Sequence, residues 1–175
     1  MKEVFFKYIN KLYLKHWVIG LCRGDIREII RSKTFCLSVK WFQFNSIDHF
    51  LADPFFLDSN DGHLSIFLED FSLNDFYGKI SLLTLDNNFE RISQTMLLDT
   101  GSHLSYPFIF KENSKLYVFP ESSHSGKLDC YEYNMSQRSL TFVGEILKLP
   151  LLDSTILFYK DKYLRKIDKI EDHLN

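Results

Sequence analysis

The sequence predicts a mainly β protein built from repeated short strands, and three observations lead to that class. Aromatic residues make up 16% of the 175 residues, with 17 Phe and 9 Tyr, and such side chains favour the pleated, half-buried surface of a sheet. From about residue 50 onward, short apolar runs alternate with turn residues. These runs also recur about every 50 residues, which indicates an internal repeat.

The first element that the sequence predicts is an amphipathic helix over residues 2–15. Val4, Tyr8 and Leu12 recur four residues apart, while lysines fall on another face. A basic amphipathic helix is most often a solvated surface helix, and the alternative is a peripheral contact with the inner membrane. Because the lysines interrupt every apolar stretch, we expect no signal peptide and a cytoplasmic protein. Residues 1–45 are assigned to this helix and to lead-in strands.

The internal repeat defines the next part of the chain, residues 46–164. Pro54 matches Pro107, and the Gly-Lys pair at Gly78 matches the pair at Gly126. A unit of about 50 residues with four antiparallel strands is typical of a β-propeller blade, whereas the strands of a sandwich do not recur as a sequence unit. The sequence therefore predicts a partial β-propeller of two blades and part of a third. The expected copies are residues 50–100, 101–149 and 150–164.

Each copy begins with a strand, a polar turn and a second strand, and two further strands follow in the complete copies. Beyond the third copy, residues 165–175 are mainly charged and are expected to form a tail of helical character. First strands are expected at 55–57, 108–110 and 155–159, second strands at 64–68 and 116–119, and fourth strands at 94–98 and 141–147, with each third strand after a Gly-Lys pair.

The repeat also predicts a cluster of acids. Asp53, Tyr106 and Asp153 occupy one equivalent position before the first strands, which line the central channel of a propeller, and Glu69 and Glu121 follow the second strands toward the same mouth. Glycoside chemistry requires one protonated carboxyl group and one carboxylate. Alternatively, acids beside Pro or Ser satisfy backbone N–H groups at strand ends. Both interpretations stay open from the sequence.

The tract from Gly101 to Pro107 adds His103, Ser105 and Tyr106, whose polar groups suit the hydroxyl groups of a sugar. A Ser-His-acid hydrolase is the alternative role for His103, but the chain has no G-x-S-x-G motif. Histidine and cysteine spacings predict no metal site, and no glycine-rich phosphate loop or other cofactor motif is present. A net charge of -2 without a long run of one sign argues against nucleic acid as a partner.

Six segments follow one another along the chain: WVIGL at 17–21, FLADPF at 50–55, Glu69, HLSYPF at 103–108, FPESS at 119–123 and LLDSTIL at 151–157. In this order they resemble the N-terminal domain of glucosamine inositolphosphorylceramide transferase and its bacterial relatives, a branch of the five-bladed propellers typified by arabinanases, β-xylosidases and levansucrases. The resemblance implies a carbohydrate-active domain in which Asp53 is the general base, Glu121 the acid and Asp153 a modulator of the acid. The sequence departs from this pattern at Tyr106, where the other copies have Asp.

Five blades would need about 250 residues, but only about 115 lie between Phe50 and Leu164. We therefore expect an incomplete ring whose exposed edge favours self-association. Three functions remain open. The chain is a carbohydrate-active enzyme or transferase component for a surface polysaccharide or glycolipid, with catalytic Asp53, Glu121 and Asp153. The second possibility is a non-catalytic sugar-binding module that positions a glycan for a partner glycosyltransferase. The third is an inactive truncated fragment. Glu69, His103, Ser105 and Tyr106 are the expected substrate-binding residues.

Overall fold

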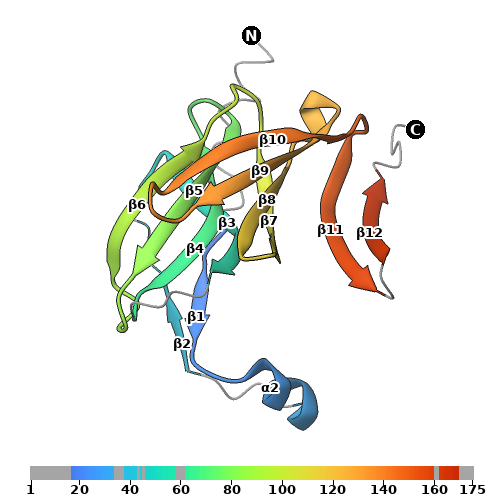
Figure 1. Cartoon of the computed structure of the whole chain (residues 1–175). Helices are drawn as coiled ribbons and strands as arrows, with labels where there is room; N and C mark the ends of the chain where they lie inside the picture. Colours follow the sequence, from blue (N-terminus) through green and yellow to red (C-terminus); the bar gives the residue numbers. More distant parts are fainter. Residues whose placement is uncertain are drawn as a thin grey trace, which may run out of the picture.

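The chain is mainly β, as the sequence predicts (Figure 1). A computed structural model describes residues 17–33, 38–42, 44, 46–57, 62–159 and 162–169. The amphipathic helix expected at residues 2–15 lies outside these residues. In the described part, helical structure is confined to α2 (Ile26–Ser32) and to the short 3₁₀ helix η1 (Ser123–Ser125).

Three antiparallel sheets follow one another along the chain, and each is made of consecutive strands. We name them unit 1, with order β3-β4-β5-β6, unit 2, with order β7-β8-β9-β10, and unit 3, with β11-β12. Figure 1 shows them side by side. Their strands are β3 (His49–Leu57), β4 (Leu64–Ser72), β5 (Tyr77–Leu85), β6 (Arg91–Leu98), β7 (Ser105–Glu112), β8 (Lys115–Glu121), β9 (Leu128–Asn134), β10 (Ser139–Leu147), β11 (Leu151–Tyr159) and β12 (Lys162–Lys169).

Two details of these strands differ from expectation. First strands begin several residues earlier than expected, because Asp53 and its counterparts lie inside the strands rather than before them. Residues 165–169, expected as the start of a helical tail, are part of β12 instead. This strand pairs with β11 from Tyr159 opposite Lys162 to Leu151 opposite Lys169, so pairing in a hairpin overrides the helical pattern of the charges.

A small hairpin and α2 precede the three units. Strands β1 (Gly20–Cys22) and β2 (Val39–Trp41) pair with each other. Ile19 and Phe42 flank the hairpin and pack in a buried cluster with Leu51 and Leu68 of unit 1. Asp25 caps the start of helix α2, because its side chain accepts a hydrogen bond from the backbone N–H of Arg27, and none of the helix residues is buried. The hairpin is therefore anchored to unit 1, and the helix projects away from the sheets (Figure 1).

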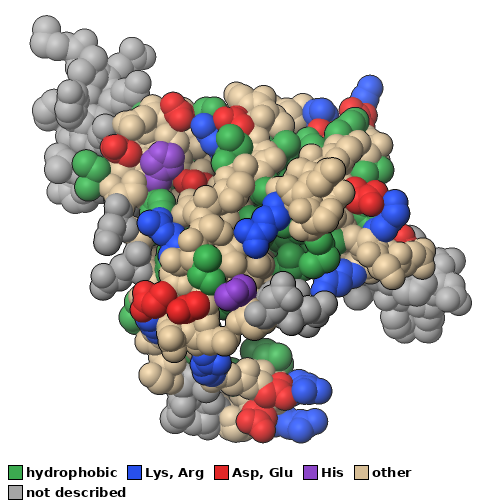
Figure 2. Space-filling model, turned by 60° about the vertical axis from the view of Figure 1, so that its left-hand side comes forward, with side chains coloured by type: hydrophobic (Ala, Val, Ile, Leu, Met, Phe, Trp, Pro, Cys, Tyr) green, Lys and Arg blue, Asp and Glu red, His purple; other side chains and the backbone are tan. Residues whose placement is uncertain are grey.

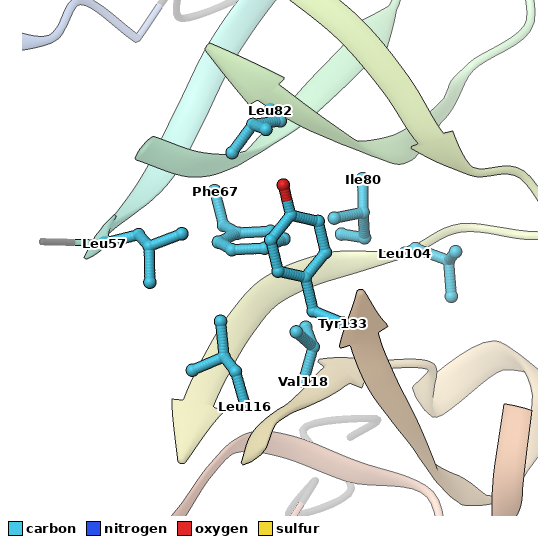
Figure 3. Packing of buried hydrophobic residues seen from close by; sticks show 8 residues of the cluster. All are labelled: Leu57, Phe67, Ile80, Leu82, Leu104, Leu116, Val118 and Tyr133. Atoms are coloured by element: carbon cyan, nitrogen blue, oxygen red, sulfur yellow. The ribbon is translucent and has the colours of Figure 1, made fainter. Parts of the chain in front are cut away.

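Units 1 and 2 share one hydrophobic core. Figure 3 shows the ring of Tyr133, from β9, among side chains of unit 1, and its centroid lies 5.0 Å from that of Phe67 in an edge-to-face arrangement. Because Phe67 is completely buried at this junction, the two sheets cannot separate without exposing it. The buried residues of this cluster are Leu57, Phe67, Ile80, Leu82, Leu104, Leu116, Val118 and Tyr133.

The surface carries charges of both signs. On the face drawn in Figure 2, basic and acidic side chains are interspersed, and hydrophobic side chains reach the surface between them. Arg27 and Asp25 form an ion pair, as do Lys115 and Glu132. No continuous patch of one sign covers this face.

Candidate functional site

The three units carry the same irregularity in their first strands. The register between first and second strand jumps at one place in each unit, so that two residues of the first strand stand opposite one residue of the second. The first of these is Asp53, Tyr106 or Asp153, with φ of 48°, 41° and 44°. A β-bulge with left-handed backbone is a built feature that redirects a strand. The equivalence inferred from sequence spacing is thus a conformational equivalence as well.

Each bulge is also the point at which one unit is joined to the next. The backbone N–H of Tyr106 donates to Oδ2 of Asp53 at 3.2 Å. In the same way the N–H of Asp153 donates to Oε2 of Glu121 at 3.4 Å. A bulge frees backbone N–H groups from the ladder, and here an acid of the preceding unit accepts them. This is the strand-end role that the sequence left open for Asp53 and Glu121.

Glu69 is the most perturbed acid of the cluster. It lies opposite Ala52 in the register of β3 and β4 and is only 6% exposed. Burial raises the pKa of Glu69 to about 8, and the charges of Asp53 and Glu121 together with a side-chain hydrogen bond to Asp53 add to the rise. At neutral pH this carboxyl group therefore holds its proton, and the hydrogen bond joins a neutral acid to the carboxylate of Asp53.

Gly78 makes room for this buried carboxyl group. A Cβ atom at Gly78 would lie 2.3 Å from Oε1 of Glu69 and 2.5 Å from the carbonyl oxygen of Leu104. The carbonyl group of the glycine is itself fixed by a hydrogen bond from the N–H of Leu104, at 2.9 Å. Glycine inside a strand marks close approach of another group, and here that group is the side chain of Glu69.

His103 is oriented by the same glycine. The backbone N–H of Gly78 donates to Nδ1 of His103 at 2.9 Å, so the neutral ring carries its proton on Nε2. Nδ1 also lies 3.8 Å from Oε1 of Glu69. Burial lowers the pKa of His103. The ring is therefore held neutral and presents an N–H donor, rather than a base, on its Nε2 side, which does not suit a Ser-His-acid mechanism.

Glu121 acts as an acceptor on both of its oxygens. It is 7% exposed and ends β8 opposite Ser105. Oε1 accepts a hydrogen bond from the hydroxyl of Ser123 at 2.9 Å, while Oε2 faces the N–H of Asp153. These contacts hold Glu121 in place as a bridge between units 2 and 3.

The remaining expected residues lie at the edge of the cluster. The Tyr106 ring packs edge-to-face on Phe55 at 4.8 Å, and its hydroxyl lies 3.2 Å from Oγ1 of Thr155. Ser105 is buried in the register position opposite Glu121. Asp153 is exposed, and its backbone N–H contacts the cluster through Glu121.

The structure thus brings Asp53, Glu69, Glu121 and His103 together. Sequence reasoning missed the roles of Gly78 and Ser123, although the glycine was a landmark of the repeat and an interior glycine was a usable signal. In the register of unit 3, Asp168 lies opposite Leu152, the position that Glu69 and Glu121 hold in units 1 and 2. Each second strand therefore has an acidic residue at this register position.

Neither a cluster of potential metal ligands nor a long apolar helix is found in the described part of the chain. Within it, no three His, Cys, Asp or Glu side chains are arranged to hold a metal ion. No helix among the described residues has the length and apolar character needed to cross a membrane.

Comparison with known proteins places the chain in a family. Residues 31–171 match the family model described as glucosamine inositolphosphorylceramide transferase 1, N-terminal. The chain belongs to this family. A glucosamine inositolphosphorylceramide transferase 1 of Arabidopsis thaliana is 35% identical over 116 residues, which are 66% of this chain and 15% of the relative. The protein of the same name from Oryza sativa subsp. indica is 30% identical over 112 residues, 63% of this chain and 15% of the relative. The chain thus aligns with a small part of these relatives.

Proposed function

We propose that the chain is a carbohydrate-active β-propeller domain in which units 1, 2 and 3 are consecutive blades. Two four-stranded sheets with the same order support this, since a blade is a four-stranded antiparallel meander. First strands line the axis of a propeller, and β7 contacts both β3 and β11. The sequence resemblance to a branch of the five-bladed propellers leads us to the same architecture. The described sheets form an open arc of such a ring.

The observation that carries the proposed activity is the pair formed by Glu69 and Asp53. Glycoside chemistry uses a protonated carboxyl group to assist a leaving group and an ionised carboxylate to activate an attacking hydroxyl or stabilise positive charge. The pKa of Glu69 is raised to about 8, so the group keeps its proton at neutral pH, and it lies beside Asp53. We assign Glu69 as the proton donor and Asp53 as the carboxylate. This differs from the resemblance-based assignment, in which Glu121 is the acid, because both oxygens of Glu121 already accept hydrogen bonds.

The substrate class that we propose is suggested by the names of the relatives. Their name combines glucosamine with inositolphosphorylceramide, and we extend this to the present chain as a glycolipid, or a surface polysaccharide of similar sugar chemistry. The proposed partner is a glycosyltransferase that acts on the same glycan. The proposed location is the cytoplasmic side of the inner membrane, with residues 2–15 in peripheral contact, and fractionation of cells that express the tagged chain tests it.

A second candidate function is a non-catalytic module that binds the glycan for the partner enzyme. Two observations favour it. Tyr106 takes the place that Asp holds in units 1 and 3, which removes one carboxylate from the ring. Glu121 is engaged in joining units 2 and 3. Under this interpretation the cluster orients sugar hydroxyl groups and no bond is broken.

One experiment separates the two functions. The purified chain is tested on a glycan array that includes glycolipid headgroups and, in parallel, for cleavage or transfer on aryl glycosides. Catalysis by Glu69 predicts activity that declines above pH 8 and falls at least about a hundredfold in Glu69→Gln, while the exposed-site control Glu145→Gln stays active. If the wild-type chain and both variants bind glycans without turning them over, the result supports the non-catalytic binding module. Absence of both binding and turnover refutes the proposed function.

A further inference from the structure

A cavity lies next to the carboxyl cluster. Its volume is about 350 Å³, within the range of roughly 300–1,000 Å³ that small-molecule sites occupy. Ser102 and Leu104 line it, whereas His103 between them contacts Gly78. Pro120 and Ser122 line it as well, on either side of the cluster residue Glu121. Residues that line the cavity thus alternate with residues of the carboxyl cluster along both segments, so the two sites are adjacent and separate.

The wall of this cavity contains a carboxylate with an unmet hydrogen bond. Asp129 lines the cavity, and its side chain is 7% exposed. Oδ2 pairs with Nζ of Lys127 at 2.7 Å, but Oδ1 is buried and has no hydrogen-bond donor among the described residues. A buried acceptor without a donor is costly and rare in folded proteins. Because Oδ1 itself is closed off, a ligand hydroxyl group would reach it only with a rotation of the Asp129 side chain, and it would then supply the missing donor.

Hydroxyl and aromatic groups complete the lining. The hydroxyls of Thr100 and Ser102 lie 3.1 Å apart and bond to each other, and each retains capacity for a further partner. Phe142 lines the cavity while 56% of its surface is exposed. Its ring is held edge-to-face against Tyr131 at 5.6 Å. An exposed ring beside hydroxyls and a carboxylate matches a sugar, whose ring presents C–H groups on its face and hydroxyls at its edge.

We propose that this cavity binds a neutral sugar residue or cyclic polyol, as a subsite separate from the carboxyl cluster. The ligand is neutral because Lys127 and Asp129 neutralise each other, which leaves no net charge to hold an anion. The identity of the ligand as part of a glycan rests on the proposed function. Its place in the cavity rests on Asp129, the two hydroxyls and Phe142.

The test is ¹H–¹⁵N chemical-shift mapping on the whole chain. The probes are glucose, N-acetylglucosamine and myo-inositol, with inorganic phosphate as the anionic probe. The expected result is that a neutral probe shifts the amide signals of Ser102, Lys127 and Phe142. Shifts confined to Asp53 and Glu69 overturn the subsite but leave the proposed function standing. Shifts by phosphate alone, or no shift at the cavity with any probe, also overturn the subsite.

Variants then measure the contribution of the lining. Phe142→Ala and Asp129→Asn are each expected to weaken binding about tenfold or more, as loss of a stacking face or of a charged hydrogen-bond acceptor does. Phe56→Ala is the matched control, because Phe56 on β3 is equally exposed, at 59%, and lies outside the cavity. Glu69→Gln leaves binding here unchanged. Equal loss in Phe56→Ala and Phe142→Ala would contradict the proposal, whereas loss of glycan turnover by Glu69→Gln tests the proposed function alone.

Discussion

Replacement of Glu69 by glutamine should remove a pH dependence of stability that the wild-type protein carries. Because the folded state raises the pKa of this carboxyl group from 4.5 to about 8, the folded chain holds a proton that the unfolded chain releases. Stability is therefore greatest below pH 4.5 with respect to this group, and it falls as the pH rises toward 8. At about 1.4 kcal/mol per unit of pKa, the full interval amounts to about 5 kcal/mol.

The window between pH 6.5 and 8 isolates this effect. His103, whose pKa is lowered by burial, acts in the opposite direction but only below its ordinary value of 6.5. The thiol of Cys130 has a pKa raised to about 11, so its influence begins above the window. Across it the wild-type protein should lose about 1.5 kcal/mol of unfolding free energy through Glu69.

The measurement is urea unfolding, followed by circular dichroism at constant ionic strength, at several pH values in the window. Glu69→Gln keeps the size of the side chain and offers an amide N–H to Asp53, so its unfolding free energy should be nearly constant there. The control Glu145→Gln, at an exposed position on β10, should follow the wild-type slope. Parallel slopes for wild type and Glu69→Gln would show that Glu69 is not protonated in the folded state, and the assignment of the proton donor would fall.

Three further substitutions probe the carboxyl cluster and its neighbours. Asp53→Asn keeps a residue type that tolerates left-handed backbone and removes a charge, so the pKa of Glu69 should fall below 8 in carboxyl-carbon NMR titrations; an unchanged pKa would contradict their coupling. Gly78→Ala should lower stability by about 2 kcal/mol or more through overpacking, whereas Gly144→Ala, where a Cβ meets nothing within 4 Å, should change the melting temperature little. Tyr106→Phe should lose about 1 kcal/mol with its hydrogen bond to unit 3; equal stability would dismiss that link.

Much of the fold was predictable because the chain repeats itself. The spacing of Pro54 and Pro107 is enough to align two units, and the same alignment puts Asp53, Tyr106 and Asp153 at one position. Repeated sequence imposes repeated backbone, and this is why even the left-handed bulge recurs. Strand boundaries were less predictable, since the bulge extends pairing beyond the apolar runs. Closure of the ring and self-association stay predictions.

The protonation and the contacts of the site carboxyl groups were not predictable from the repeat. Glu69 and Glu121 looked equivalent, yet one is a protonated acid beside Asp53 and the other bridges two units. The difference arises from three-dimensional neighbours, because Glu69 packs against Gly78 whereas Ser123 donates to Glu121. Burial and nearby charge set a pKa, and neither is written in local sequence. The same limit applies to β12, where charged residues predicted a helix and a hairpin partner decided otherwise.

The core shared by units 1 and 2 has a consequence for how the molecule opens. Because Phe67 and Tyr133 bury each other across the two sheets, neither sheet can unfold and leave the other intact. Unit 3 reaches unit 2 through Leu151 and Ile156 of β11, which pack on a separate cluster. Amide hydrogens of β4 and β9 should therefore exchange with solvent deuterium together, at the free energy of global unfolding, while those of β11 exchange earlier. Units 1 and 2 would then behave as one cooperative folding unit, to which unit 3 attaches as a separable module.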